Sequence, residues 1–342
     1  MSLPVDLNVI WFGLVGILLA GYAVLDGFDL GVGILYLLTK KEEHRRLLLN
    51  AIGPVWDGNE VWLVTGGGAL FAAFPMVYAT VFSGFYLPFM LLLFALIFRA
   101  VAIEFRSKHA NAGWRRLWDV SFCVASAVAS LLLGTALGDM VRGIPLDATH
   151  EFAGSLIGLL NPYALLVGIT TVALFAMHGA IYVVLKTEGE LHEQARRWVN
   201  ITIPVFVVLY LLTSVVTVMY LPHMTVNMKQ LPVLVVVPLF TLVAILSVPR
   251  LIRRKLDFTA FVASALGIVG LMMLVGIGLF PNMVISSPHA ENSLTIYNAA
   301  SSLKTLKIML IIVLLGLPLV LAYTVSIYWI FRGKVKLDST SY

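Results

Sequence analysis

Residues 21–63 of the chain read GYAVLDGFDLGVGILYLLTKKEEHRRLLLNAIGPVWDGNEVWL. An apolar run that begins near residue 9 ends at Leu38, a short connection with several basic side chains follows, and a second apolar run begins near residue 47. About 20 apolar residues are enough to cross the hydrocarbon core of a bilayer as a helix. The stretch therefore predicts two membrane helices joined by a short polar loop.

The composition of the whole chain agrees with this hairpin. Of the 342 residues, 60% are apolar and 12% are charged, and the mean hydropathy is +0.96. A soluble globular chain is closer to half apolar and a quarter charged. The apolar runs are continuous rather than alternating, which excludes a β-barrel. The sequence predicts an all-α integral membrane protein, with residues 1–342 forming a single membrane domain.

Nine apolar runs can be marked along the chain as transmembrane helices. The first is too long for the core of a cleavable signal, so we expect it to remain in the protein. We expect the nine helices at about residues 9–38, 47–73, 76–103, 117–138, 162–185, 199–221, 231–248, 258–280 and 308–331.

The basic residues give the orientation of these helices. Of the 23 Lys and Arg residues, 19 lie after the odd-numbered runs, and only Arg142, Lys229, Lys304 and Lys307 lie on the other side. Basic connections stay in the cytoplasm, so the N-terminus is predicted outside (periplasmic) and the C-terminus cytoplasmic. The net charge of +5 is therefore a sign of membrane topology and not of nucleic-acid binding.

Four acidic residues interrupt the first two runs. Asp26 and Asp29 are three residues apart, as are Asp57 and Glu60, so each pair lies on one helix face. Asp29 and Asp57 each lie 11 residues from the basic ends of the connecting loop, a depth of about 16 Å. The same count puts Asp26 and Glu60 at a matched, deeper level. We therefore expect two pairs of carboxyl groups at two depths.

A carboxyl group inside the bilayer carries a large free-energy cost unless it faces protein or water, so these four acids indicate a functional or structural role. Acids that lie together in a low-dielectric site cannot all be ionised, so such a cluster can accept and release protons. The sequence favours a proton relay from the cytoplasm through Asp29 and Asp57. Structural hydrogen bonds of Asp26 or Glu60, and a cation site built from the four acids, remain alternatives.

Three other features have mainly structural interpretations. Arg99 and Glu104 lie near the cytoplasmic end of the third run, where an ion pair or snorkelling is expected, although Glu104 could also be the entry group of the relay. Gly27 with Gly31, and the run 66–68, are spaced for close helix packing. His178 lacks a second intramembrane histidine, so no haem held by two histidines can be assembled from this chain.

Five motifs give a resemblance to a known family. The chain resembles subunit II of the cytochrome bd quinol oxidases over almost its whole length and in the same order. The motifs are GYAVLDGFDLGVG (21–33), GPVWDGNEVWL (53–63), GGGALFAAFPMVYATVFSGFY (66–86), HGAIYVVLKTEGELH (178–192) and NSLTIYNAASSLKTLKIM (292–309).

The resemblance implies a complex that oxidises quinol and reduces dioxygen to water in a bacterial or archaeal cell (inner) membrane. Haems b and d and the quinol-oxidising loop would lie in the companion subunit I, and some members of the family hold a structural quinone in subunit II. Small single-helix accessory subunits, lipid and quinone are further implied partners. The resemblance places Asp29 and Asp57 on a proton path, with Asp26 and Glu60 in the same motifs; some members carry Gln at Glu60.

We therefore expect a haem-free subunit that provides part of a cytoplasmic proton pathway, with no catalytic residue and no cofactor or metal ligand of its own. Two alternatives remain. The chain could be a membrane scaffold without a proton role, or an ion-coupled secondary transporter, for which an internal repeat would be expected.

Overall fold

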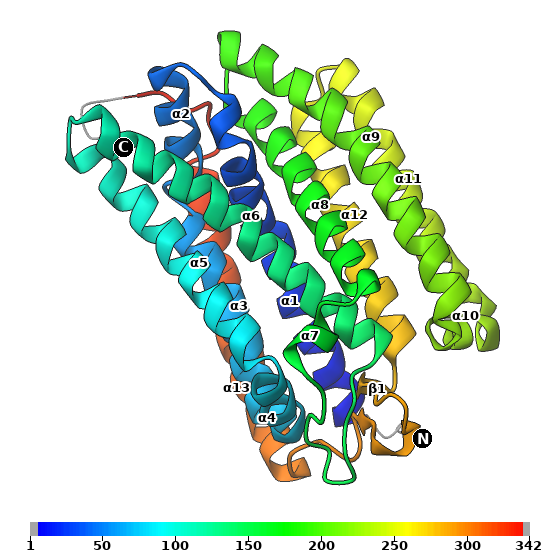
Figure 1. Cartoon of the computed structure of the whole chain (residues 1–342). Helices are drawn as coiled ribbons and strands as arrows, with labels where there is room; N and C mark the ends of the chain where they lie inside the picture. Colours follow the sequence, from blue (N-terminus) through cyan, green and yellow to red (C-terminus); the bar gives the residue numbers. More distant parts are fainter. Residues whose placement is uncertain (1–5, 338–342) are drawn as a thin grey trace.

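The computed structural model describes residues 6–337 as a bundle of long helices that run roughly parallel to one another (Figure 1). The first helix begins at the end of the bundle where the short strands lie, and the last helix ends at the opposite end, near α2. The described chain therefore crosses the bundle an odd number of times.

The described residues form thirteen α-helices and two short strands. Asp6 caps the first helix by accepting a hydrogen bond from the backbone N–H of Asn8, and Asn111 and Asn161 cap two others in the same way. The helices are α1 (Leu7–Leu35), α2 (Glu42–Ile52), α3 (Trp56–Ala73), α4 (Pro75–Gly84), α5 (Tyr86–Phe105), α6 (Ala112–Arg142), α7 (Leu156–Leu159), α8 (Pro162–Lys186), α9 (Gly189–Tyr220), α10 (Val226–Gln230), α11 (Val236–Arg253), α12 (Asp257–Leu279) and α13 (Leu303–Ile330), and the strands are β1 (Asn282–Val284) and β2 (Leu294–Thr295).

Among residues 6–337, eight helices are long and apolar enough to cross a membrane. The predicted second span, 47–73, is not one continuous helix, because α2 ends at Ile52 and α3 begins at Trp56. Pro54 lies in the break, where it cannot donate a backbone hydrogen bond. The predicted third span is interrupted in the same way, at Phe85 between α4 and α5.

The first helix is the centre of the bundle. α1 packs against α3, α6, α8, α12 and α13, while α6, α8 and α9 lie side by side and α11 pairs with α12. The last helix is attached differently, since it packs mainly against α1 and α3 and none of its most apolar stretch is buried within the chain. α13 therefore presents nearly all of its apolar surface to whatever surrounds this chain.

The closest helix contact in the core joins α1 to α8. A Cβ atom on Gly31 would lie 1.9 Å from the carbonyl oxygen of Phe175, and one on Gly179 would lie 2.4 Å from the carbonyl carbon of Gly31. The close packing predicted for Gly31 is thus confirmed. Gly67 and Gly68 make no close contact within the described chain, because a Cβ on either would meet nothing within 4 Å.

The end of the bundle opposite α2 carries an ordered cap. β1 and β2 pair antiparallel, and residues 144 and 286 form a bridge between the cap and the connection that follows α6. The ring of His150 bonds the carbonyl oxygen of Asn292 at 2.8 Å, and Asn292 donates to the carbonyl oxygen of Leu146 at 3.0 Å. These bonds tie two distant connections into one surface.

The substitution Gly179→Ala should destabilise the protein by about 1–3 kcal/mol, because the new methyl group would overlap backbone atoms that cannot move independently. Gly276→Ala is the matched control, since its Cβ would meet only Phe12 at an ordinary 3.9 Å. Thermal unfolding of the detergent-purified protein, followed by tryptophan fluorescence, measures both. Equal transition temperatures for the two variants would show that the α1–α8 contact tolerates a side chain.

Candidate functional site

A buried ion pair joins α1 to α5 near the middle of the bundle. Both terminal nitrogens of Arg99 donate to the carboxylate of Asp26, at 2.5 and 2.8 Å. Neither side chain has any exposed surface. A bidentate bond of this kind is strong and directional. From the sequence we had expected Arg99 to snorkel or to pair with Glu104. It is instead fully buried, and its partner is Asp26.

Glu60 brings a third helix to the same guanidinium group. Its Oε1 lies 3.0 Å from Nη1 of Arg99, and its side chain is 22% exposed. Asp26 and Glu60 are the pair that the sequence placed at one depth, and the structure brings both to Arg99. The guanidinium of Arg99 thus lies between carboxyl groups from α1 and α3.

Asp29 lies one turn further along α1 and has a different kind of partner. The amide nitrogen of Asn59 donates to Oδ2 of Asp29 at 2.7 Å, and the hydroxyl of Tyr328 donates to Oδ1 of Asn59 at 2.9 Å. The side chain of Asp29 is fully buried, and its Oδ1 has no hydrogen-bond partner among the described residues. That oxygen can hold a proton without breaking any hydrogen bond described for it.

Asp57 faces away from this buried group. It is exposed, in the first turn of α3, and the side chain of α3 that bonds Asp29 is Asn59. The break before α3 places a helix N-terminus at this depth, where unpaired backbone N–H groups favour nearby negative charge. Asp57 is therefore an acid on the outer face of α3, beside a favourable helix end.

A second polar cluster closes the bundle at the α2 end. Asp119 is almost fully buried and accepts from Arg45 at 2.7 Å and from Arg106 at 2.5 Å. Arg106 also binds Glu42 through two bonds of 3.0 and 2.8 Å. Glu104 is half-buried, two residues before Arg106 and about 7.5 Å along the α5 axis from Arg99. Glu104 therefore lies between the two clusters.

Sequence reasoning missed three of these side chains. Asn59 lies within the motif that carries Asp57 and Glu60, yet an amide at membrane depth attracted no attention beside the acids. Tyr328 lies near the C-terminal end of an apolar run, where a tyrosine is typical of the membrane interface. Asp119 follows Trp118 close to a basic loop. Only the fold shows that all three are partners of charged groups or of each other.

His178 does not offer a ligand to haem iron. One ring nitrogen lies 3.0 Å from the carbonyl oxygen of Val24 and the other lies 2.7 Å from the hydroxyl of Ser264. A carbonyl oxygen can only accept, so Nε2 carries a proton and Nδ1 accepts from Ser264. The ring is also stacked on Phe261. Both nitrogens of His178 are thus engaged in binding α1 and α12, which does not fit a haem ligand.

The four acids also do not assemble a metal site in residues 6–337, where no group of three or more His, Cys, Asp or Glu side chains is placed to hold an ion. The guanidinium of Arg99 lies beside Asp26 and Glu60, where a bound cation would otherwise offset their negative charge. The protein itself therefore supplies the positive charge next to these two acids.

Comparison with known proteins gives consistent matches. The family model described as cytochrome bd terminal oxidase subunit II matches residues 7–331. "Cytochrome bd-I ubiquinol oxidase subunit 2" of Escherichia coli (strain K12) is 37% identical over 97% of this chain and 96% of its own. "Cytochrome bd ubiquinol oxidase subunit 2" of Bacillus subtilis (strain 168) is 37% identical over 97% of each chain.

A solved structure has the same fold. A chain of the bd oxidase from Geobacillus thermodenitrificans superposes with a TM-score of 0.79, covering 95% of this chain and 98% of its own, at 18% identity. The chain spans nearly the full length of each of these relatives.

Replacing Asp26 by Asn should destabilise the protein by about 3–5 kcal/mol, because it removes one charge of a fully buried pair and leaves Arg99 uncompensated on that side. The exposed residue Asp57 provides the control: Asp57→Asn should change stability by about 0.5 kcal/mol or less. Denaturant-induced unfolding of both variants makes the comparison. A loss for Asp26→Asn no larger than that for Asp57→Asn would mean that the pair does not hold α1 to α5.

The cluster at the α2 end predicts a dependence of stability on pH. The hydrogen bonds from Arg106 lower the pKa of Glu42 below its usual value of 4.5. A carboxyl with a depressed pKa stabilises the fold above that usual value, and the contribution disappears as pH falls through the lowered pKa. At pH 7 the wild-type protein should therefore be more stable than Glu42→Gln. The difference in the free energy of unfolding should be less than about 1 kcal/mol, because Glu42 is partly exposed.

The same difference should shrink as the pH is lowered below 4.5. Parallel thermal unfolding curves between pH 7 and pH 4 measure it. A difference that stays constant over this range would show that Glu42 contributes by packing and not by charge.

Proposed function

Because this chain belongs to the family of cytochrome bd terminal oxidase subunit II, we propose that it carries part of the path by which protons leave the cytoplasm for the oxygen-reducing partner subunit. A protein of this family is a component of a quinol:oxygen oxidoreductase, a multi-pass protein of the bacterial cell membrane, and the partner of a subunit I. Reducing dioxygen to water consumes protons. Taking them from the cytoplasm, while quinol releases its own outside, separates charge without a pump.

The position of Asp57 carries this proposal. The exposed face of α3 repeats every three or four residues as Asp57, Val61, Val64, Gly68 and Phe71, so one carboxyl lies at the end of an otherwise apolar stripe. A carboxylate facing lipid at this depth is costly. We infer that subunit I covers this face, so that Asp57 lies at the boundary between the two subunits.

The last helix supports the same boundary. α13 lies against α1 and α3 with its apolar surface uncovered by this chain, and Gly67 and Gly68 leave room beside α3 for another backbone to approach. In Figure 1, α13 and α3 lie on the side of the bundle away from α9 and α11. We propose that subunit I docks on α3 and α13.

The proposed path uses the acids in different ways. Asp29 carries protons, since its Oδ1 is buried with no partner among the described residues and the chain Tyr328–Asn59 fixes its other oxygen. Asp57 passes them toward the subunit boundary. Asp26 is held by Arg99 and contributes charge and rigidity, while Glu60 shares that guanidinium with part of its surface exposed. Glu104 is the proposed entry group on the cytoplasmic side.

The topology follows from the same assignment. We propose nine crossings, made by α1, the broken pairs α2–α3 and α4–α5, and then α6, α8, α9, α11, α12 and α13 in one membrane domain. The N-terminus is then periplasmic and the C-terminus cytoplasmic. Haems b and d and the quinol-oxidising loop belong in subunit I, which agrees with the engaged ring of His178. Some complexes of this family would add small single-helix subunits or a structural quinone.

A scaffold role for part of the site has an observation of its own. The bidentate bond between Arg99 and Asp26 is fully buried, and a group held in this way is better suited to fixing helices than to exchanging protons. The relay and the scaffold therefore differ at Asp29 and Asp57, and not at Asp26.

We predict that Asp29→Asn, purified as the complex with subunit I and with full haem content, loses oxidase turnover by roughly 100-fold or more, because the amide keeps the bond to Asn59 but cannot carry a proton. Asp57→Asn should lower turnover in the same direction. Quinol-driven oxygen consumption measures both.

Asp139→Asn is the matched control. Like Asp29, Asp139 is buried, accepts a hydrogen bond from an asparagine (Asn161, at 2.6 Å) and has one oxygen without a hydrogen-bond partner among the described residues. It lies near the C-terminal end of α6, at the end of the bundle opposite α2. It should leave turnover within about twofold of wild type. Normal turnover in a fully haem-loaded Asp29→Asn complex would refute the relay, and loss of haem in that variant would assign Asp29 to the scaffold.

A further inference from the structure

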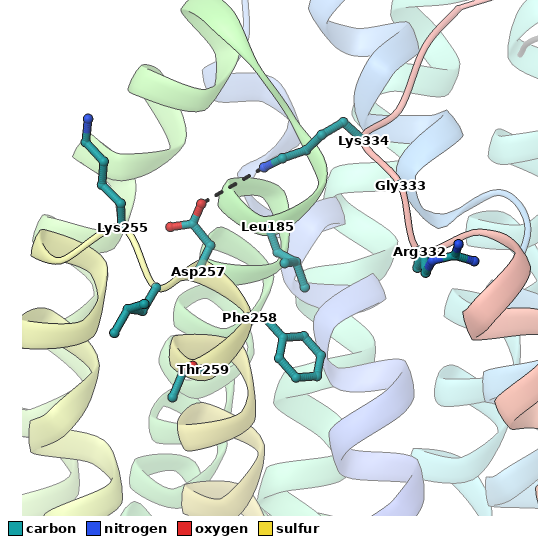
Figure 2. A pocket seen from close by; sticks show the side chains of 9 residues that line it. Leu185, Lys255, Asp257, Phe258, Thr259, Arg332, Gly333 and Lys334 are labelled. Carbon is teal, nitrogen blue, oxygen red and sulfur yellow. Dashed lines mark ion pairs between the residues drawn. The ribbon is translucent and has the colours of Figure 1, made fainter.

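A pocket of about 480 Å³ lies at the α2 end of the bundle, away from the acidic cluster. It forms where the end of α8, the start of α12 and the segment that follows α13 meet (Figure 2). The lining residues are Leu185, the turn and first residues of α12 at 255–259, and residues 332–334. Three segments far apart in the sequence therefore build one concave surface.

Hydrogen bonds fix the wall of this pocket that comes after α13. The ammonium of Lys186 donates to the carbonyl oxygens of Phe331 and Gly333, the second at 2.8 Å. The backbone N–H of Val335 donates to the carbonyl oxygen of Lys186 at 2.8 Å, and Nζ of Lys334 lies 3.2 Å from that of Val184. The segment is thus tied to the end of α8, so the pocket has a defined shape.

The pocket has an excess of positive charge. Lys255, Arg332 and Lys334 line it together with a single acid, Asp257. The carboxylate of Asp257 lies 4.0 Å from Lys334 and 3.9 Å from Arg196, too far for hydrogen bonds, and its Oδ1 is buried without a hydrogen-bond partner. Figure 2 shows Lys255 and Lys334 on opposite sides of Asp257. Asp257 therefore cannot neutralise the four basic groups around it.

The backbone of Lys255 is the second observation. Its φ of 59° lies in the left-handed region, which costs an ordinary residue roughly 1 kcal/mol and which glycine adopts freely. The turn closes α11 with a hydrogen bond from the N–H of Lys255 to the carbonyl oxygen of Ile252 at 3.0 Å. A glycine would adopt this turn without strain, so the lysine occupies it at a cost in backbone energy.

The surroundings identify the ligand. Below the basic groups, Phe258 is 67% exposed and Leu256 is 46% exposed, so the charged pocket opens directly onto an apolar surface. The pocket also lies on the side of the bundle that carries most of the basic connections. A ligand that fits must combine a negative head with an apolar body. Basic pockets between membrane helices on the cytoplasmic side are suited to anionic phospholipid headgroups.

We propose that the pocket formed by Lys255, Arg332 and Lys334 binds the phosphate-bearing headgroup of an anionic phospholipid of the cytoplasmic leaflet, with its acyl chains along Phe258 and α12. Arg332 borders the pocket on the side away from Lys255, where its guanidinium stacks on Trp329 at 4.1 Å and donates to the carbonyl oxygen of Trp329 at 2.7 Å (Figure 2). Lys255 and Lys334 contact the phosphate from the two sides of Asp257.

The test is a lipid titration of the purified two-subunit complex in detergent, followed by native mass spectrometry, with phosphatidylglycerol and with phosphatidylcholine. The wild-type complex should bind phosphatidylglycerol in preference. Lys255→Gly should weaken that binding about fivefold, and its folding should not suffer, because glycine suits the left-handed turn. Lys334→Gln should act in the same direction. Lys108→Gln, which removes an exposed lysine at the same end of the bundle, should have no effect.

Several results would overturn the proposal. Equal affinity for the two lipids, or unchanged binding in Lys255→Gly, would remove the headgroup site. An equal loss in Lys108→Gln would show diffuse attraction in place of a site. Displacement of the lipid by millimolar inorganic phosphate would show that the pocket binds a free anion.

Discussion

The fully buried guanidinium of Arg99 constrains how α1, α3 and α5 can lie. It bonds Asp26 on α1 with two nitrogens and lies 3.0 Å from Glu60 on α3, so a shift of any one of the three helices would leave a charge in a low-dielectric interior without its partner. The same ion pair divides the acids by role. It neutralises Asp26, and it leaves Asp29, one turn away, as a buried carboxyl whose charge no ion pair offsets among the described residues.

The break between α2 and α3 has a comparable effect on the outer face. Because the helix restarts at Trp56, the first turn of α3 carries Asp57 beside backbone N–H groups that have no helical partner. An acid can be tolerated at this depth only with such support and with protein or water around it. The acids make α3 a poor membrane helix by composition. The break before α3 helps it to carry Asp57, because the break places a helix N-terminus beside that carboxylate.

Much of this architecture could be read from the sequence. Apolar runs and basic loops give the long helices, since burial of apolar length in lipid is the dominant requirement, and the three-residue spacing of Asp26 and Asp29 predicts their shared face. The partners of the charged side chains could not be predicted from the sequence, because they depend on how each helix is rotated about its own axis. Arg99 reaches Asp26 on α1, and Asn59 is the side chain of α3 that bonds Asp29. Tyr328 joins the site from more than 260 residues away, a contact that no local pattern encodes.

The hydrogen bond between Tyr328 and Asn59 also has a consequence for biogenesis. α13 is the most C-terminal helix of residues 6–337, and it packs against the rest of the described chain mainly through α1 and α3. The hydrogen-bond chain that orients Asp29 is therefore complete only after this helix has been synthesised, inserted and docked. If subunit I docks on its apolar side as proposed, α13 is held by few contacts until that docking occurs. A subunit made in excess of its partner thus exposes to the quality-control machinery of the membrane the same helix that completes the hydrogen bonds of Asp29.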